Sequence, residues 1–289
     1  MKPWQYKVLV ANIVAQCGIV VTGAIVRLTS SGLGCPTWPD CVPGSITPTS
    51  DQTQAWHKYI EFGNRLLTFV LVVVAILTIV AMRGQRQSLR RMSLATLVGI
   101  FAQAVLGGVT VLTGLNPLVV ASHFLLSVGL IAIAVTLHWR SHEEGDNNRL
   151  PVVAQPIFLA SRLQTWLALI IIVIGTLVTG TGPHAGDSAK ISRLPFDPRM
   201  ISWFHSDVVV LFIGLSFGIV IAMLSTHAAA NITRAAWIVI AVSLGQGLIG
   251  YVQYFTGLPW VLVACHVLGA VVLWVSVIRL RLSCVSHSV

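Results

Sequence analysis

Gln103-Ala-Val-Leu-Gly107, followed by Thr113-Gly-Leu115 and Ala121-Ser-His123, is the stretch that decides the fold, because its motif occurs twice. The second copy has the same residues in the same order, at Gln246, Gly250, Thr256, Gly257, Leu258, Ala264 and His266. Each matched pair is separated by 143 residues, as from His123 to His266. An ungapped series of this kind indicates an internal duplication. Both copies place a histidine within an apolar segment, where an ionisable residue is costly and therefore a functional candidate.

The composition indicates an integral membrane protein. Of 289 residues, 55% are hydrophobic and 9% are charged, and the mean hydropathy is +0.84, whereas soluble domains are about 25% charged. A bilayer is crossed by about 20 apolar residues in a helix, and eight runs approach this length. We expect helices at 8–27, 58–82, 93–113, 117–138, 163–181, 203–225, 234–255 and 259–279.

A second repeated motif divides these helices into two halves. Gly18-Ile-Val-Val-Thr-Gly23 recurs as Gly175-Thr-Leu-Val-Thr-Gly180, so each half has four helices that begin on the same side. Parallel repeats of this kind are related by an axis along the membrane normal. The sequence therefore predicts two tandem four-helix bundles with pseudo-twofold symmetry, at 1–140 and 163–289. The polar segment 141–162 is the expected cytoplasmic linker, and it contains Glu143, Glu144, Gly145, Asp146, Asn147 and Asn148.

The distribution of positive charge predicts the orientation. With the N-terminus inside, 12 of the 18 Lys and Arg residues are cytoplasmic, as the positive-inside rule requires. The six expected outside are Arg27, Lys58, Arg65, Lys190, Arg193 and Arg199. We expect a multi-pass protein of the cell membrane with both termini cytoplasmic. The net charge of +9 then reflects topology and contact with anionic lipid, rather than binding of nucleic acid.

Three histidines are expected at one depth. His123 and His266 follow Pro117 and Pro259 by six and seven residues, which places them roughly 10 Å below the outer surface. His205 lies at a similar depth, near the outer start of the sixth helix. Two neutral imidazoles at one level within a four-helix bundle can serve as axial ligands of a heme iron. The alternative is that each imidazole only hydrogen-bonds a backbone carbonyl.

The first half lacks one member of this pattern. Alignment of the helix starts sets Asn64 against His205, so His123 has no evident histidine partner. Glu61 lies one turn from both His57 and Arg65, on one helical face. Glu61 and Arg65 could simply neutralise each other. The asymmetry nevertheless suggests one permanently ligated cofactor site and one site where a molecule binds and reacts.

The loop after the first helix carries a pair of cysteines, in Gly34-Cys35-Pro-Thr-Trp-Pro-Asp-Cys41. The expected topology places this loop outside, where disulfides persist. A short gap with two prolines allows the two thiols to meet, and a structural staple and a redox role are equally compatible with it. Cys17, Cys265 and Cys284 are expected to be reduced.

These motifs resemble the heme A synthase family. The resemblance is carried by Thr22-Gly-Ala-Ile-Val-Arg27, by the cysteine motif and by Ile60-Glu-Phe-Gly-Asn-Arg65, and it extends over essentially the whole chain. It implies oxidation of the C8 methyl group of heme O to a formyl group, which makes heme A for terminal oxidases. It also implies heme b ligation by His205 and His266, substrate heme ligation by His123, an essential carboxylate at Glu61 and a disulfide between Cys35 and Cys41.

One departure from the family pattern concerns the substrate heme. Many members have histidine where this chain has Asn64. Either His57 substitutes for it, or the substrate iron is five-coordinate, or Asn64 contacts it weakly. Arg65 is a further candidate contact.

The resemblance implies heme O, membrane lipid, a heme O synthase and a terminal oxidase assembly as partners, and it leaves the electron acceptor open. The rival functions are a bis-histidine cytochrome b that only carries electrons and a small-molecule transporter. The electron carrier would not need Glu61, and the transporter would not need histidines at ligand depth.

Overall fold

A computed structural model describes residues 1–143, 145, 149–187 and 191–287. Within these ranges it has eight α-helices, each long and apolar enough to cross a membrane, which confirms the predicted all-α membrane fold. They are α1 (Pro3–Leu28), α2 (His57–Ala81), α3 (Gln87–Leu112), α4 (Pro117–Arg140), α5 (Gln155–Thr181), α6 (Pro198–Ser225), α7 (Ala230–Phe255) and α8 (Trp260–Ser283).

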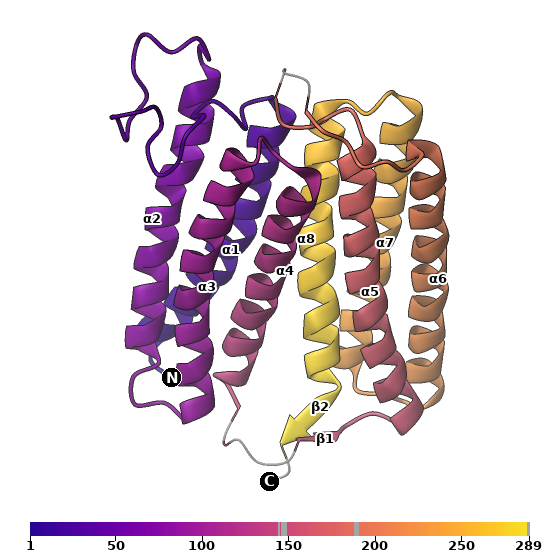
Figure 1. The fold of residues 1–289 in the computed structure, drawn as a ribbon. Helices are drawn as coiled ribbons and strands as arrows, with labels where there is room; N and C mark the ends of the chain where they lie inside the picture. The colour runs from indigo at the N-terminus through magenta and orange to yellow at the C-terminus, as the bar shows by residue number, and fades with distance from the viewer. Residues whose placement is uncertain (144, 146–148, 188–190, 288–289) are drawn as a thin grey trace.

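The helices form two four-membered rings that stand side by side (Figure 1). In the first ring α1 packs on α2, α2 on α3, α3 on α4, and α4 on α1, and α5 to α8 pack in the same cyclic order. Between the rings, α1 contacts α8, α4 contacts α5, and α4 contacts α8. If α1 to α4 are exchanged with α5 to α8, the contacts of α1 with α8 and of α4 with α5 replace each other, and that of α4 with α8 is unchanged. The predicted twofold relationship requires this.

The largest apolar core joins the two halves. It includes Val20 and Val128 from the first half and Phe212, Val239 and Val277 from the second. The indole nitrogen of Trp274 on α8 donates to the carbonyl of Val128 on α4 at 2.9 Å. Lipid chains are as apolar as these side chains, so close packing and such interhelical hydrogen bonds hold the halves together.

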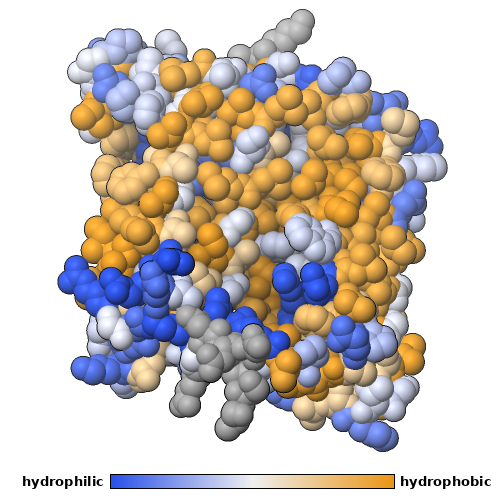
Figure 2. Space-filling view, turned by 60° about the horizontal axis from the view of Figure 1, so that its bottom comes forward, coloured by the Kyte–Doolittle hydropathy of each residue, from blue (hydrophilic) through white to orange (hydrophobic). Residues whose placement is uncertain are grey.

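Large apolar side chains cover the outside of the bundle, as expected for a surface solvated by lipid. Examples are Phe69, Val98, Leu163 and Ile221, all at least half exposed. Figure 2 shows a broad hydrophobic belt on one face of the molecule, with hydrophilic residues toward the two ends.

The linker is shorter than expected. Helix α5 begins at Gln155, inside the expected linker 141–162, because Pro156 fits the first turn of a helix and Ile157 is already buried in the core. The linker also contains strand β1 (Arg149–Pro151), which pairs antiparallel with β2 (Val285–His287) near the C-terminus. The sequence analysis did not predict these strands. Glu144, Asp146, Asn147, Asn148 and Lys190 lie outside the described residues.

Candidate functional site

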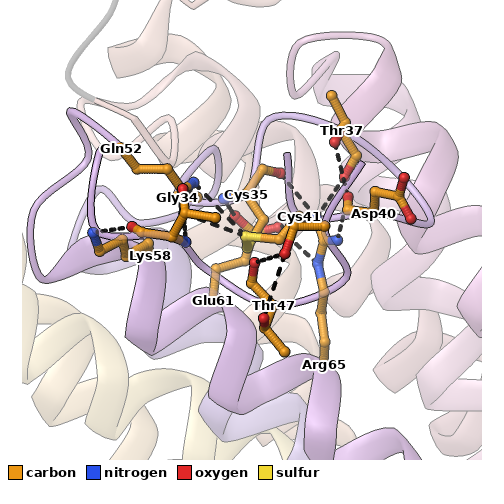
Figure 3. The surroundings of a disulfide bond; sticks show 12 residues. Gly34, Cys35, Thr37, Asp40, Cys41, Thr47, Gln52, Lys58, Glu61 and Arg65 are labelled. Atoms are coloured by element: carbon orange, nitrogen blue, oxygen red, sulfur yellow. Dashed lines mark hydrogen bonds and ion pairs between the residues drawn. A yellow bond between two sulfur atoms is a disulfide. The ribbon is translucent and has the colours of Figure 1, made fainter. Parts of the chain in front are cut away.

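The loop between α1 and α2 is tied to the first turns of α2 through Glu61 (Figure 3). Cys35 and Cys41 form a disulfide with both residues fully buried. The backbone N–H of Cys35 donates to Glu61 Oε2 at 2.5 Å. Glu61 is 6% exposed, so its carboxylate is covered by the loop rather than open to water.

Arg65 binds both the carboxylate and the loop. Its Nη2 donates to Glu61 Oε1 at 2.7 Å, so the ion pair that the sequence allowed as a structural alternative is present. The same guanidinium donates to the carbonyls of Cys35 at 2.8 Å, Thr37 at 3.0 Å, Asp40 at 3.2 Å and Pro39 at 3.4 Å. The five donors of a guanidinium suit this arrangement, and the loop is thereby fastened over Glu61.

Two further side chains hold the loop, and the sequence analysis did not identify either role. Lys58 is buried, and its Nζ donates to the carbonyl of Thr49 at 2.7 Å. Gln52 donates to the carbonyl of Gly34 at 3.1 Å. Lys58 had been counted only as an outer positive charge. Apart from its position at a helix start, nothing in the sequence indicates that this lysine is buried and binds loop carbonyls.

Glycines allow the loop to approach the helices closely. A Cβ atom on Gly34 would lie 2.5 Å from the carbonyl oxygen of His57, at the start of α2. The indole of Trp38 packs against α3 at Gly108, where an added Cβ would overlap the ring. The loop therefore covers this end of the first half from α2 to α3.

The second half also reaches this site. The loop between α5 and α6 forms an isolated bridge from Asp187 to Ser31, and Gly32 N donates to the carbonyl of Gly186 at 2.7 Å. Ser31 Oγ in turn lies 3.0 Å from His57 Nδ1. The sequence analysis missed this contact because its partners are more than 150 residues apart. Asp187 is thus a candidate site residue contributed by the other half.

Each of the three candidate ligand histidines has its ring against a glycine of the neighbouring helix. A Cβ on Gly107 would lie 3.3 Å from Cε1 of His123; the corresponding distance is 3.5 Å for Gly250 and His266. These two contacts are related by the offset of 143 residues seen in the sequence. His205 has the same relationship to Gly175 on α5, at 3.4 Å. The glycines leave room for the imidazoles inside the bundles.

His205 and His266 come from α6 and α8, which are diagonal members of the second ring. They lie about 10 Å and 9 Å from the starts of their helices at 1.5 Å per residue.

The Nδ1 atoms of His123, His205 and His266 are buried, and no described residue hydrogen-bonds them. The three imidazoles are partly buried and lie at one level, and those of His205 and His266 come from diagonal helices. This arrangement fits axial ligation of a heme iron.

Asn64 and His57 differ in position within the first half. Asn64 Nδ2 lies 4.0 Å from the position of a Cβ on Gly23 of α1, and its Oδ1 is buried with no described partner. Counted along α2, Asn64 lies about 10 Å below the helix start, close to the depth of His123 on α4. His57 is the first residue of α2, and it contacts Ser31 and stacks on Trp56.

The fold and these contacts define a multi-pass membrane protein. It has two four-helix halves, buried imidazole nitrogens suited to heme iron, and a carboxylate covered by a disulfide-bonded loop. The chain belongs to the COX15-CtaA family, described as cytochrome oxidase assembly protein, whose model matches residues 6–278.

Individual relatives are similar over parts of their length. A heme A synthase of Geobacillus thermodenitrificans is 32% identical over 108 residues, which are 36% of this chain and 32% of that protein. Heme A synthase of Shewanella oneidensis is 27% identical over 182 residues, 56% of this chain and 51% of the relative. Heme A synthase of Listeria monocytogenes is 30% identical over 142 residues, 47% of this chain and 44% of the relative. The matched segment thus spans about one third to one half of these relatives.

Proposed function

We propose that this protein is a heme A synthase, which oxidises the C8 methyl group of heme O to a formyl group. Family membership and the names of the relatives support this activity. The observation that carries the proposal is the position of Glu61. It is a buried carboxylate under a disulfide loop, in the half where His123 faces no second histidine.

The second half is the proposed site of a resident heme b. His205 and His266 would hold its iron from diagonal helices, with Gly175 and Gly250 making room for their rings. Bound there, heme b supplies one-electron transfer. This chain contributes the two imidazoles and an apolar, water-excluding bundle around them.

The first half is the proposed site of the substrate heme, with His123 as its ligand. Asn64 lies near the depth of His123, whereas His57 lies about two turns further out and is occupied by Ser31. This arrangement favours a five-coordinate substrate iron, or one that Asn64 contacts weakly, over ligation by His57. Arg65 remains close to this site through its ion pair with Glu61.

Glu61 is the proposed catalytic residue. Conversion of a methyl to a formyl group, with water as the oxygen source, consumes one water and releases four electrons and four protons. The electrons pass to an external acceptor. A carboxylate beside the reacting carbon stabilises developing positive charge and orients the attacking water. Arg65 and the Cys35 N–H hold the two oxygens of Glu61 in one position.

The alternative function is an electron-carrying cytochrome b without synthase activity. The ion pair between Glu61 and Arg65 favours it, because a purely structural carboxylate would make the same contact. Expression of this chain with an enzyme that makes heme O, followed by extraction and chromatography of the hemes, separates the two functions. The synthase produces heme A, and the electron carrier leaves heme O unchanged.

We also propose the orientation and the partners. With the N-terminus inside, α1 ends outside, so the disulfide loop and the proposed heme sites lie near the outer surface of the cell membrane. The proposed protein partners are an enzyme that supplies heme O and the assembly of a terminal oxidase that receives heme A.

A further inference from the structure

Two amide side chains are buried deep in α1. Asn12 is 1% exposed and Gln16 is 2% exposed. Both amide atoms of Asn12 and the Nε2 of Gln16 have no hydrogen-bond partner in the part of the chain that the structure describes. An unpaired buried amide is costly, and among the buried amides of the described residues Asn12 is the one that leaves both of its side-chain atoms unpaired.

Both amides face the interior of the first half. Leu9, Asn12 and Gln16 are buried residues at helical spacing on one stripe of α1. Leu9 packs with Ala81 of α2 and Leu137 of α4, inside the first ring. On the flanks of this stripe, Ile19 packs toward α2 and Cys17 toward the core between the halves. Asn12 and Gln16 therefore point between these flanks, toward the axis of the first bundle.

A buried glutamine of the second half has one amide atom paired and one, the Oε1 of Gln164, without a partner among the described residues. Gln164 is similarly buried on α5, and its Nε2 donates to Ser216 Oγ at 2.8 Å. This glutamine is nine residues from the inner start of α5, as Asn12 is nine residues from the start of α1. Ser216 thus pairs with the amide nitrogen of Gln164, whereas the described residues supply no partner to either amide atom of Asn12 or to the Nε2 of Gln16.

The depth of the amides relates them to the substrate heme. Gln16 lies roughly 6–9 Å further from the outer surface than His123, and Asn12 lies about 6 Å beyond Gln16. If the charged propionates of a porphyrin held by His123 face water at the nearby outer surface, the opposite ring edge would point inward, toward Gln16. In heme O this edge carries the hydroxyethylfarnesyl chain, whose hydroxyl group heme b lacks.

We propose that Asn12 and Gln16 bind the hydroxyl of the hydroxyethylfarnesyl chain and thereby select heme O over heme b. This inference rests on the proposed function. An amide offers both donors and an acceptor to a hydroxyl group. A site with buried hydrogen-bonding groups rejects an analogue that lacks the hydroxyl, because its own polar groups are then left unpaired.

The test is a spectroscopic titration of the purified full chain, already loaded with heme b in the second half. Heme O and additional heme b are titrated separately, and binding to the first half is defined as the signal lost in His123→Ala. We expect the wild-type chain to prefer heme O. In Gln16→Met and Asn12→Leu the preference should fall by about tenfold, through weaker binding of heme O alone. Gln164→Met, which removes a buried amide of the second half, should leave the preference intact.

A second readout is thermal stability without added heme O. Replacing an unpaired buried amide by an apolar group of similar size is neutral or stabilising, so the apolar variants should unfold at or above the wild-type temperature. Gln16→Asn keeps the amide on a side chain that is shorter by one methylene group, so its preference for heme O should also fall. An unchanged preference in all three variants, or a wild-type chain that binds both hemes equally, overturns the proposal. Heme A formation is assayed separately, so failure of the proposed function is seen independently.

Discussion

The backbone N–H of Cys35 donates to Oε2 of Glu61 at 2.5 Å, and this bond joins the disulfide to the buried carboxylate of the first half. Arg65 completes the connection, since it binds the other carboxylate oxygen and four carbonyls of the same loop. The position of Glu61 therefore depends on the loop as much as on α2. Substitutions that move the loop away from α2 should therefore displace the Glu61 carboxylate even when they do not contact it.

Gly34→Ala tests this dependence. The new Cβ would lie 2.5–2.9 Å from backbone atoms of His57 and Lys58, so the loop must move away from α2. We expect the free energy of unfolding to fall by about 1–3 kcal/mol, as for other overpacked sites. Conversion of heme O should fall with it, while the heme b spectrum stays unchanged. Thermal denaturation and heme extraction measure the two effects.

Gly63→Ala is the matched control, because a Cβ on Gly63 meets no atom within 4 Å. Alanine is the better helix former, so this variant should be as stable and as active as the wild type. Equal behaviour of the two glycine variants would contradict the close packing of the loop on α2.

The disulfide gives a test of the orientation. A membrane-impermeant maleimide added to intact cells should label Cys35 and Cys41 only after reduction, because the pair is bonded and the proposed topology places it outside. Burial raises the pKa of the Cys284 thiol beyond the end of α8, so this cysteine should react slowly from either side. Mass spectrometry identifies the labelled sites. Labelling of the pair only from the cytoplasmic side would reverse the topology.

The sequence was sufficient for the fold because membrane helices have a strong signal. Runs of about 20 apolar residues locate all eight, and the repeat offsets divide them into halves that the helix contacts match. The start of α5 was placed too late because its first turns carry polar residues such as Gln155 and Arg162. The strands β1 and β2 were missed because three-residue strands have no usable periodicity.

The site was only partly predictable. Spacing predicted that Glu61 and Arg65 share a face, and the ion pair between them is present. The bond from Cys35 to Glu61, the contact of Asp187 with Ser31 and the burial of Asn12 depend on tertiary packing. No local pattern encodes such contacts, since their partners come from separate helices and loops.

His266→Ala should remove the proposed heme b. Because His205 and His266 are the diagonal pair at one depth, loss of one ligand should abolish most of the low-spin signal or convert it to high spin. Visible spectra of the purified variant measure this change. His142→Ala, at the exposed end beyond α4, is the control and should retain the spectrum. A low-spin spectrum that survives His266→Ala would remove His266 from the ligand set.

Glu61→Gln separates the proposed chemistry from structure. Glutamine keeps the size of the side chain and can still accept from the Cys35 N–H, but it removes the charge that faces Arg65. If developing positive charge on the substrate needs the carboxylate, conversion of heme O should fall by orders of magnitude, at about 1.4 kcal/mol for each factor of ten. The second-half heme b spectrum should remain, and heme O or a partly oxidised form should accumulate on the protein.

The control for this variant is Asp51→Asn, which removes an exposed loop carboxylate bonded only locally to Ser50. It should make heme A at the wild-type rate. Extraction and chromatography of the hemes, with thermal denaturation alongside, distinguish lost chemistry from lost folding. A Glu61→Gln variant that folds normally and makes normal amounts of heme A would leave Glu61 as a structural partner of Arg65. The first half would then have no proposed catalytic residue. The disulfide loop would cover a carboxylate that the reaction does not use.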